Sequence, residues 1–392
     1  MDVLDDEERR ARLAWQHRLL PGRRTDDLTV IADDLVALHS TDPVTVHLSA
    51  LARMEHPSIG AVERAVYDDR RLIRHHAMRR TLWLATPEVA RAMHAAATRK
   101  LVGPERRRVA KLLTESGIAD PEAWLDEAAR QTLDFLREHG ASTARELGSR
   151  VPALRQPLVM AAGTPWEATV SAHSRLLVLL GFAGEIIRVR PTGSWVNGAY
   201  RYVAAADWLP GGFGAVDERA AAAELARRWL RAFGPGTTTD LKWWMGWTVA
   251  TTQRALADVC AVPVDLADGP GWVAADDPGP PPAEPWVALL PGLDPSTMGW
   301  KERSWYLPAA AAEAFDSNGN GGPTIWVDGR IVGAWAQTSD GHLHTHYFEA
   351  VAADRRREVA ERAGELQTWV GETRFTVRFP GHVHARILGE HR

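Results

Sequence analysis

The sequence predicts an α+β protein built from small domains in tandem, each combining helices with a short strand pair. Three observations support this fold class: a 13-residue segment recurs further along the chain, the helical period gives way to a strand period after each copy, and a proline-rich linker precedes a β-rich C-terminal region. The 392 residues are 45% apolar and 24% charged, with a net charge of −4. This composition excludes collagen, coiled coils and general disorder.

The repeat aligns Phe135–Leu147 with Trp229–Leu241 at a constant offset of 94 residues. Aromatic, Leu, Arg, Gly, Thr and acidic positions match between the copies. In each copy a helix ends near a glycine, and the turn that follows supplies a Ser or Thr N-cap for the next helix. In the first copy Thr143 and Glu146 fit a capping box. The pattern therefore predicts a duplicated domain with two helices joined by a tight turn.

A third helix and a strand pair complete each predicted copy. In the first copy we expect the helix at 164–181, where a capping box starts it, and strands at 185–190 and 200–203. In the second copy we expect a helix at 248–259 and short strands within 262–273. Three helices followed by a hairpin is the winged helix-turn-helix arrangement, in which the third helix commonly enters a groove of DNA.

Helical patterns also dominate the first 125 residues, where a strand at 77–84 follows several helices. We expect this part to be a third copy of the same unit with a degraded sequence. The expected helices are 5–20, 28–38, 43–54, 59–67 and 88–100.

The linker Asp276–Pro282 cannot continue a helix or a central strand because it is rich in proline. The segments after it are β-rich, and Asp328-Gly329 between two apolar runs predicts a type I′ hairpin. A helix at 355–370 and a strand at 374–379 are expected to close the chain. The expected domains are 1–125, 126–215, 216–275 and 276–392.

Positive charge is concentrated between Arg70 and Lys111, where twelve basic residues stand against two acidic ones, Glu88 and Glu105. A basic block in an otherwise acidic chain is typical of a surface that binds a polyanion, and arginine suits bidentate phosphate contacts. A solvated helix surface explains the charge run alone equally well. Together with the expected helix-turn-helix units, the block predicts DNA binding.

Three aromatic residues of the second copy, Trp243, Trp244 and Trp247, fall in its turn and helix. An aromatic run at helical spacing is most often core packing, so we expect these rings to be buried. Stacking on DNA bases is the alternative.

The single cysteine, Cys260, permits no disulfide within the chain. No segment approaches the roughly 18 consecutive apolar residues of a membrane helix, and the first thirty residues do not resemble a signal peptide. We therefore expect a cytoplasmic, nucleoid-associated monomer that does not contact a membrane.

His342, His344 and His346 lie on one face of an expected strand, with a spacing compatible with a three-histidine metal site. No further acid or cysteine is tied to them by spacing, so a strand that faces solvent or DNA is the simpler interpretation. The sequence shows no phosphate-binding glycine loop, zinc-finger cysteine pair or nucleophile elbow. We predict no metal and no cofactor; a metal-dependent hydrolase is the alternative that these histidines would support.

The segment Leu35–Pro43 ends one expected helix and begins the next. Thr41 or Asp42 fits the N-cap of the second helix, and Pro43 fits its first helical position. Capping leaves two hydrogen-bonding side chains unexplained at the end of an apolar stretch, His39 and Thr41. The segment is therefore a candidate for a reactive site.

In this order, the motifs of the chain resemble those of the AlkZ/YcaQ-type winged-helix DNA glycosylases, over nearly the whole length. The resemblance implies three tandem winged helices in a C-shaped array, followed by a β-rich C-terminal region. It also implies hydrolysis of the N-glycosidic bonds of alkylated or crosslinked bases, such as N7-alkylpurines, in base excision repair. The matching segments, besides the duplicated units, are 38–43, 74–82, 289–295 with Lys301 and Arg303, and 327–335.

The catalytic motif of that family is a glutamine, an apolar residue, and a glutamine or aspartate just before an Asp-Pro-like helix start. The matching positions here are His39, Ser40 and Thr41. The resemblance thus points to His39 as general base and Thr41 as the residue that positions the water, while Asp42 stabilises the cationic sugar. A base alkylated at a ring nitrogen is cationic and leaves without a general acid. We therefore expect this variant to favour strongly activated leaving groups over undamaged purines.

The resemblance also places cations along the DNA. The expected partner is double-stranded DNA that carries alkylated bases, and the affinity should fall steeply with salt. A non-enzymatic winged-helix protein, such as a transcription regulator that dimerises on a palindromic site, is the alternative on the same scaffold. The expected DNA-binding residues are Arg71, Arg74, Arg79, Arg80, Lys301, Arg303 and Arg330.

Overall fold

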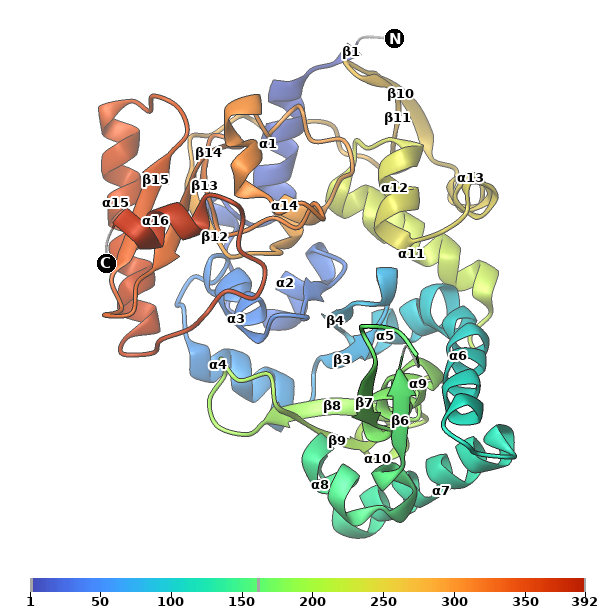
Figure 1. The fold of residues 1–392 in the computed structure, drawn as a ribbon. Coiled ribbons are helices and arrows are strands. Elements are labelled where there is room, and N and C mark those ends of the chain that lie inside the picture. Colours follow the sequence, from blue (N-terminus) through green and yellow to red (C-terminus); the bar gives the residue numbers. More distant parts are fainter. Residues whose placement is uncertain (1–2, 161–162, 391–392) are drawn as a thin grey trace.

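Three helical units, each with a small sheet, run through the computed structural model, which describes residues 3–160 and 163–390 (Figure 1). The first two sheets have the orders β2-β4-β3 and β5-β9-β8, so the strand in front of the second helix lies beside the last strand of its unit. In the third unit a single bridge between Gly236 and Trp272 takes the place of that first strand. The three units therefore share one strand topology.

The first unit carries the candidate segment 39–42 between its first strand and its second helix. An additional helix precedes the unit, and several helices lead from it into the second unit. The unit comprises α2 (Leu28–Asp34), β2 (Leu38–His39), α3 (Pro43–Leu51), α4 (Ile59–Glu63), η2 (Arg64–Asp68), β3 (Ile73–His76), η3 (Met78–Arg80) and β4 (Leu82–Ala85). The flanking elements are α1 (Asp6–Gln16), η1 (Pro21–Arg23), α5 (Pro87–Met93), η4 (His94–Thr98), η5 (Arg99–Leu101) and α6 (Val102–Glu115).

The second and third units confirm the predicted repeat. Both predicted turns close as capping boxes, Thr143 with Glu146 and Thr237 with Asp240. The second unit comprises α7 (Pro121–His139), β5 (Ser142–Thr143), α8 (Ala144–Arg150), η6 (Pro152–Arg155), β6 (Pro157–Met160), β7 (Ala168–Ser171), α9 (His173–Ala183), β8 (Ile186–Pro191), β9 (Tyr200–Ala204) and α10 (Ala205–Trp208). The third comprises α11 (Glu218–Phe233), α12 (Thr238–Met245), α13 (Val249–Asp258), β10 (Val262–Leu266) and β11 (Gly269–Val273), with β1 (Val3–Leu4) parallel to β10.

A four-stranded antiparallel sheet forms the C-terminal region, in the order β12-β13-β14-β15. Its β13–β14 turn has positive φ at both Asp328 and Gly329, which confirms the predicted hairpin. One face of the sheet shares a core with α2, α3 and α15, so the C-terminal region packs directly on the first unit. The elements are β12 (Val287–Leu290), α14 (Pro295–Met298), η7 (Ala309–Ala314), β13 (Thr324–Val327), β14 (Arg330–Gln337), β15 (Leu343–Tyr347), α15 (Ala353–Val370) and α16 (His384–Glu390).

The helix predicted at 164–181 is wrong in its first half. Thr164 and Glu167 close a turn instead of a helix start, because the Gly163 N–H donates to Glu167 Oε2 at 2.7 Å and the Trp166 N–H to Thr164 Oγ1 at 3.2 Å. Residues Ala168–Ser171 then form β7, which pairs with β6. The helix begins only at His173. The same residue types serve turns and N-caps, so sequence could not separate them.

The predicted strand at 77–84 has the wrong bounds, and the strand predicted at 374–379 is absent. Arg79 and Arg80 both have positive φ, at 54° and 63°, which breaks the first segment into β3, a tight turn and β4. The second segment contains no strand, and its Phe375 N–H donates instead to the Gln337 side chain at 3.1 Å. Both departures bring irregular backbone to the candidate segment.

The loop between β8 and β9 packs inward on the first unit. Trp195 is 6% exposed, and its ring lies 5.0 Å from that of His47 in α3 and 6.2 Å from that of Phe375. Gly198 allows a close approach here, because a Cβ at this position would lie 1.8 Å from an Arg378 guanidinium nitrogen. The loop therefore joins the second unit, the first unit and the C-terminal segment.

A buried ion pair connects α3 to the turn after β12. The side chains of Arg53 and Asp294 are both 0% exposed and form two hydrogen bonds, at 2.8 and 2.9 Å. Ser49 Oγ and the Ser296 N–H donate to the same carboxylate, and Arg53 also donates to the His17 carbonyl. None of the described helices combines the length and the apolar character needed to cross a membrane.

Replacement of Asp294 by Asn leaves the Arg53 charge buried without its partner. We expect Asp294→Asn to lower the free energy of unfolding by about 3–5 kcal/mol, measured by urea denaturation. The double variant Arg53→Met/Asp294→Asn removes the orphaned charge and should lose less than the single variant. Equal losses in the two variants would contradict the assignment of the pair as the cause.

Candidate active site

The candidate segment 39–42 joins β2 to α3. His39 ends β2 and pairs with Trp83 of β4, while Asp42 is the N-cap of α3. Asp42 Oδ1 accepts a hydrogen bond from the Val44 N–H at 3.1 Å, and Pro43 occupies the first helical position. The predicted helix start at Asp42 is therefore confirmed.

The second carboxylate oxygen of Asp42 is held from the far end of the chain. Oδ2 accepts a hydrogen bond from the Arg378 N–H at 3.0 Å, and the Arg378 guanidinium reaches the Thr41 carbonyl at 3.5 Å. Asp42 is 3% exposed, and burial raises its pKa although both backbone donors act in the opposite direction. A carboxylate with a raised pKa accepts a proton more readily than an ordinary one.

His39 is enclosed beside Trp83, with 3% of the residue exposed and the ring centroids 4.8 Å apart. Burial, assisted by the nearby positive charge of Arg79, lowers its pKa to about 3. The Thr41 N–H points to His39 Nδ1 at 3.5 Å, a contact that assigns the ring proton to Nε2. The imidazole is therefore neutral at pH 7 and a weak proton acceptor.

Thr41 is the partly exposed member of the segment. Its Oγ1 accepts a hydrogen bond from the Leu82 N–H at 3.2 Å, which fixes the hydroxyl oxygen against the start of β4. The hydroxyl hydrogen then remains to be donated. This geometry suits a side chain that holds a water molecule or a substrate oxygen.

Arg74, a predicted DNA contact, lies inside the protein. It is 2% exposed, and it donates to Ser40 Oγ at 2.7 Å and to the Tyr67 hydroxyl at 2.9 Å. Its guanidinium also lies 4.4 Å from the centroid of the Tyr200 ring. Arg74 therefore holds the candidate segment from the protein interior through its hydrogen bond to Ser40.

Arg79 and Arg303, two further predicted DNA contacts, are brought together beside the segment. Their guanidinium carbons lie 4.0 and 5.3 Å from the centroid of the Trp243 ring. Lys301, also predicted, is exposed two residues before Arg303, and its N–H donates to Asp240. The structure thus collects cations from the first unit and the C-terminal region around one indole ring of the third unit.

The remaining predicted cations pair with acids instead. Arg71 lies 3.1 Å from Asp27, Arg80 3.9 Å from Glu105, and Arg330 3.4 Å from Glu349. Within the basic block, Arg106 pairs with Glu122 and Asp126, which lie outside the block, at 2.5 and 2.7 Å. The block is therefore partly neutralised, which a count along the sequence could not show.

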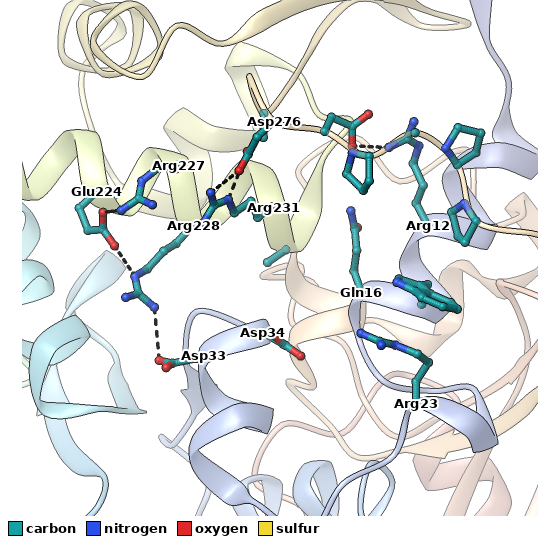
Figure 2. Close-up of a pocket in the computed structure, with 18 of the residues that line it drawn as sticks. Arg12, Gln16, Arg23, Asp33, Asp34, Glu224, Arg227, Arg228, Arg231 and Asp276 are labelled. Atoms are coloured by element: carbon teal, nitrogen blue, oxygen red, sulfur yellow. Dashed lines mark hydrogen bonds and ion pairs between the residues drawn. The ribbon is translucent and has the colours of Figure 1, made fainter.

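A cavity of about 640 Å³ lies between α1, α2, α11 and the proline-rich linker, away from the candidate segment (Figure 2). Several arginines along its wall are paired: Arg228 with Glu224 at 2.6 Å, Arg12 with Asp277 at 2.6 Å, and Arg231 with Asp276. None of the residues 39–42 lines it. The cavity is therefore not the place where the predicted chemistry occurs.

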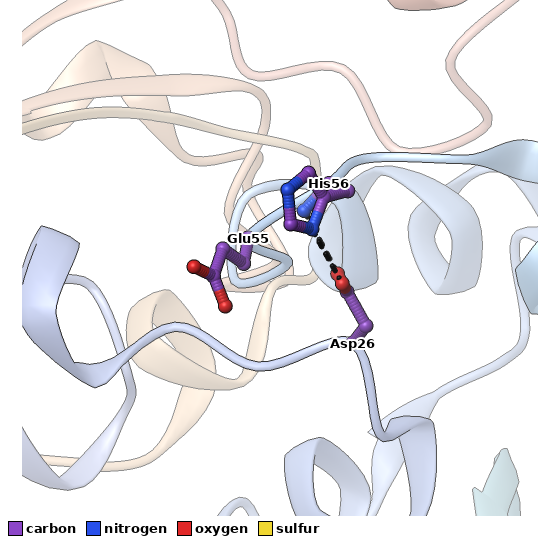
Figure 3. Close-up of side chains that lie close together, drawn as sticks. All are labelled: Asp26, Glu55 and His56. Carbon is purple, nitrogen blue, oxygen red and sulfur yellow. Dashed lines mark hydrogen bonds and ion pairs between the residues drawn. The ribbon is translucent and has the colours of Figure 1, made fainter.

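Within the described residues, one group of three side chains has its metal-ligating atoms within 4.8 Å of one another: Asp26, Glu55 and His56 (Figure 3). All three are exposed, and His56 Nδ1 lies 2.8 Å from Asp26 Oδ2. The histidines of the β15 region are directed to separate partners: His342 to Gln367 at 3.3 Å and His346 to Arg386 at 3.2 Å. The β15 histidines therefore do not converge on one metal position.

The comparisons with known proteins cover the candidate segment. The model of the AlkZ-like DNA glycosylase family matches residues 32–369. This chain belongs to the AlkZ-like DNA glycosylase family. It is therefore an enzyme of the class that hydrolyses N-glycosidic bonds in DNA, which sets aside the alternative of a non-enzymatic regulator.

The AlkZ-like chain also shares its fold with a solved member of that class. Streptomyces sahachiroi DNA glycosylase AlkZ matches with a TM-score of 0.74 and 18% sequence identity, over 96% of this chain and 100% of that chain. At this identity the match establishes the fold and leaves the site to be argued from the side chains. A search of the curated proteins finds no match.

Two residues at the site, Arg378 and Trp243, were not foreseen in their roles. Arg378 lies in a segment expected to be a strand, and nothing in its sequence surroundings relates it to Asp42, 336 positions away. Trp243 was expected in the core with Trp244 and Trp247; those two are 0% and 6% exposed, whereas Trp243 is partly exposed and contacts arginines. An aromatic run alone gives no signal for this difference.

The buried histidines make stability depend on pH. His39 has a pKa of about 3 in the folded protein, below the ordinary value of 6.5 expected in the unfolded chain. The unfolded chain therefore binds the proton first, and this contribution to the free energy of unfolding is lost as the pH falls from about 6.5 to about 3. Urea denaturation at pH 7.5, 6 and 5 should show a smaller decline for His39→Gln than for the unchanged protein. Identical declines would contradict the burial of a neutral His39.

Proposed function

We propose that this AlkZ-like protein excises purines alkylated at N7, including crosslinked ones, from double-stranded DNA. The observation that carries the proposal is the protonation state of segment 39–42. His39 is neutral near pH 7 because burial lowers its pKa to about 3, so its imidazole has no acidic proton to give to the leaving base. A purine that is already cationic needs no protonation to leave, so such a site suits alkylated bases and disfavours undamaged ones.

We assign the positioning of the attacking water to Thr41 and the stabilisation of the positive charge on the sugar to Asp42. The Thr41 hydroxyl retains a hydrogen to donate, since its oxygen is already engaged by the Leu82 N–H. Asp42 offers a negative charge beside it, and its raised pKa makes it a proton acceptor for the attacking water. His39, expected from the sequence to be the base, acts here as a neutral group that orients Thr41 through its backbone N–H.

The fold supports the grip on DNA. We propose that the three units with shared strand topology are winged helices in a C-shaped array, with domains at 1–125, 126–215 and 216–275 and a β-rich region at 276–392. The enzyme acts as a monomer on nucleoid DNA. Support comes from the uncompensated cations Arg79 and Arg303 beside the segment, which the polyanion would neutralise.

Excision from a duplex with one N7-methylguanine, read as alkali-sensitive strand breaks under single-turnover conditions, tests these roles. We expect Asp42→Asn to lower the rate by about 10²-fold or more, because Asn keeps the helix cap and loses the charge. Thr41→Ala should lower it by about 10- to 100-fold through misplaced water, and Thr41→Ser should recover most of that loss. His39→Gln should lower it less than Asp42→Asn.

The matched control is Arg357→Gln on α15, a charge change at a side chain that is 74% exposed, which should leave the rate unchanged. An acid limb near pH 6.5 that disappears in His39→Gln would return the proton transfer to His39. No strand breaks from the unchanged protein on this duplex would overturn the proposed substrate class.

A further inference from the structure

We infer that Arg79, Trp243 and Arg303 form a binding site for the phosphates of one DNA strand, next to the sugar that faces segment 39–42. The inference rests on the proposed function, because it names the part of the DNA that the three residues bind. It assigns to Trp243 the role of a spacer between two guanidinium groups. The chemical class of the ligand is therefore a phosphodiester backbone and not a base.

Arg79 and Arg303 form a pair of like charges. No carboxylate of the described residues lies within 4.0 Å of Arg79 or Arg303, whereas the predicted DNA contacts Arg71, Arg80 and Arg330 each have one. Arg303 acts on Arg79 as a like charge, and together with burial it lowers the Arg79 pKa to about 10. Two cations held close without an acid repel each other, so an anion bound to both relieves the repulsion.

Contacts within the protein hold the guanidinium of Arg303 in place without any ligand. Arg303 donates from Nε to the Trp300 carbonyl at 3.1 Å and from a terminal nitrogen to the Gly319 carbonyl at 3.2 Å. Its guanidinium also lies 4.4 Å from the centroid of the Phe315 ring. Neutral carbonyls and rings hold the group in place without cancelling its charge.

Arg79 lies in a turn with an unusual backbone conformation. Arg79 and Arg80 both adopt positive φ, a conformation that costs free energy for residues other than glycine and that persists mostly at functional sites. The Arg79 Nε is buried and has no hydrogen-bond partner among the described residues. A buried donor without a partner is uncommon, and together with the strained turn it indicates that Arg79 is under functional constraint.

The Trp243 ring is already covered by the two guanidinium groups. Both guanidiniums sit over its ring, so they compete with a base for the surface on which the base would stack. The ring keeps the two positive groups near each other, and one DNA strand presents a continuous row of negatively charged phosphates to such a pair. The arrangement therefore matches a run of phosphates better than an aromatic ligand.

The position of the site connects it to the reaction. Arg79 lies in the turn between β3 and β4, and Leu82, three residues later, donates its N–H to Thr41 Oγ1. The positive charge of Arg79 also contributes to the low pKa of His39. A strand whose phosphates rest on Arg79 and Arg303 thus presents the adjoining sugar to Thr41.

The experiment measures binding of the full chain to an undamaged duplex as a function of salt, by fluorescence anisotropy. We expect Arg79→Gln and Arg303→Gln each to reduce the slope of log Kobs against log salt by about 0.9, and the double variant by about twice that. Trp243→Leu should weaken binding at low salt with both arginines still present, while Trp243→Phe, which keeps a ring, should bind more tightly than Trp243→Leu. Arg357→Gln, on α15, is the matched control and should leave the slope unchanged.

Unchanged slopes in both single variants would overturn the phosphate site, as would slopes altered no more than in Arg357→Gln. Equal binding by Trp243→Phe and Trp243→Leu would overturn the spacer role. A loss of affinity that is independent of salt would indicate base contacts instead. Because the duplex carries no lesion, these outcomes do not depend on excision, and a failure of the proposed glycosylase chemistry is detected separately by the strand-break assay.

Discussion

The buried pair of Arg53 and Asp294 is the contact on which the arrangement of the molecule depends. Arg53 follows α3, and Asp294 lies in the turn that leaves β12, so the pair joins the helix of the candidate segment to the C-terminal sheet. The His17 carbonyl accepts from the same guanidinium, which adds the end of α1 to the network. Charges buried this completely are stable only when every donor and acceptor is matched. The chain meets that condition with neighbours from three distant segments, and their relative positions are fixed as a result.

The candidate site inherits this precision. Segment 39–42 is bounded by a strand pairing on one side and by the N-cap of α3 on the other, so its backbone has little freedom. Asp42 serves two structural contacts, with Val44 and with Arg378, and it still carries the charge that the proposed reaction requires. The cost of burying that charge is what raises its pKa. The same carboxylate therefore serves the helix cap and the proposed reaction, and burial shifts the pKa of both titratable side chains of the segment, His39 and Asp42.

Much of the fold follows from local signals in the sequence. The repeat, both capping boxes, the Asp328-Gly329 hairpin and the helix that ends at Val370 are encoded by caps, turns and periodicity within a few residues of each element. The errors occur where a local signal has two meanings or where tertiary contacts dominate. Thr164 closes a turn, and the expected strand at 374–379 is irregular because its partners are side chains. At the site, Asp42, Thr41 and the helix start were predictable, whereas the burial of His39 and Arg74 and the approach of Arg378 depend on contacts between remote segments.

The inward loop between β8 and β9 has a consequence for how the protein meets its substrate. In many proteins with this topology the corresponding loop is exposed and contacts a nucleic-acid backbone. Here the Trp195 ring packs against His47 and Phe375, and the absence of a side chain at Gly198 leaves room for the Arg378 guanidinium. The loop therefore packs the second unit against the first unit and the C-terminal segment. A junction packed in this way would leave any bending or unstacking on binding to the double helix, and a damaged base lowers the cost of that deformation.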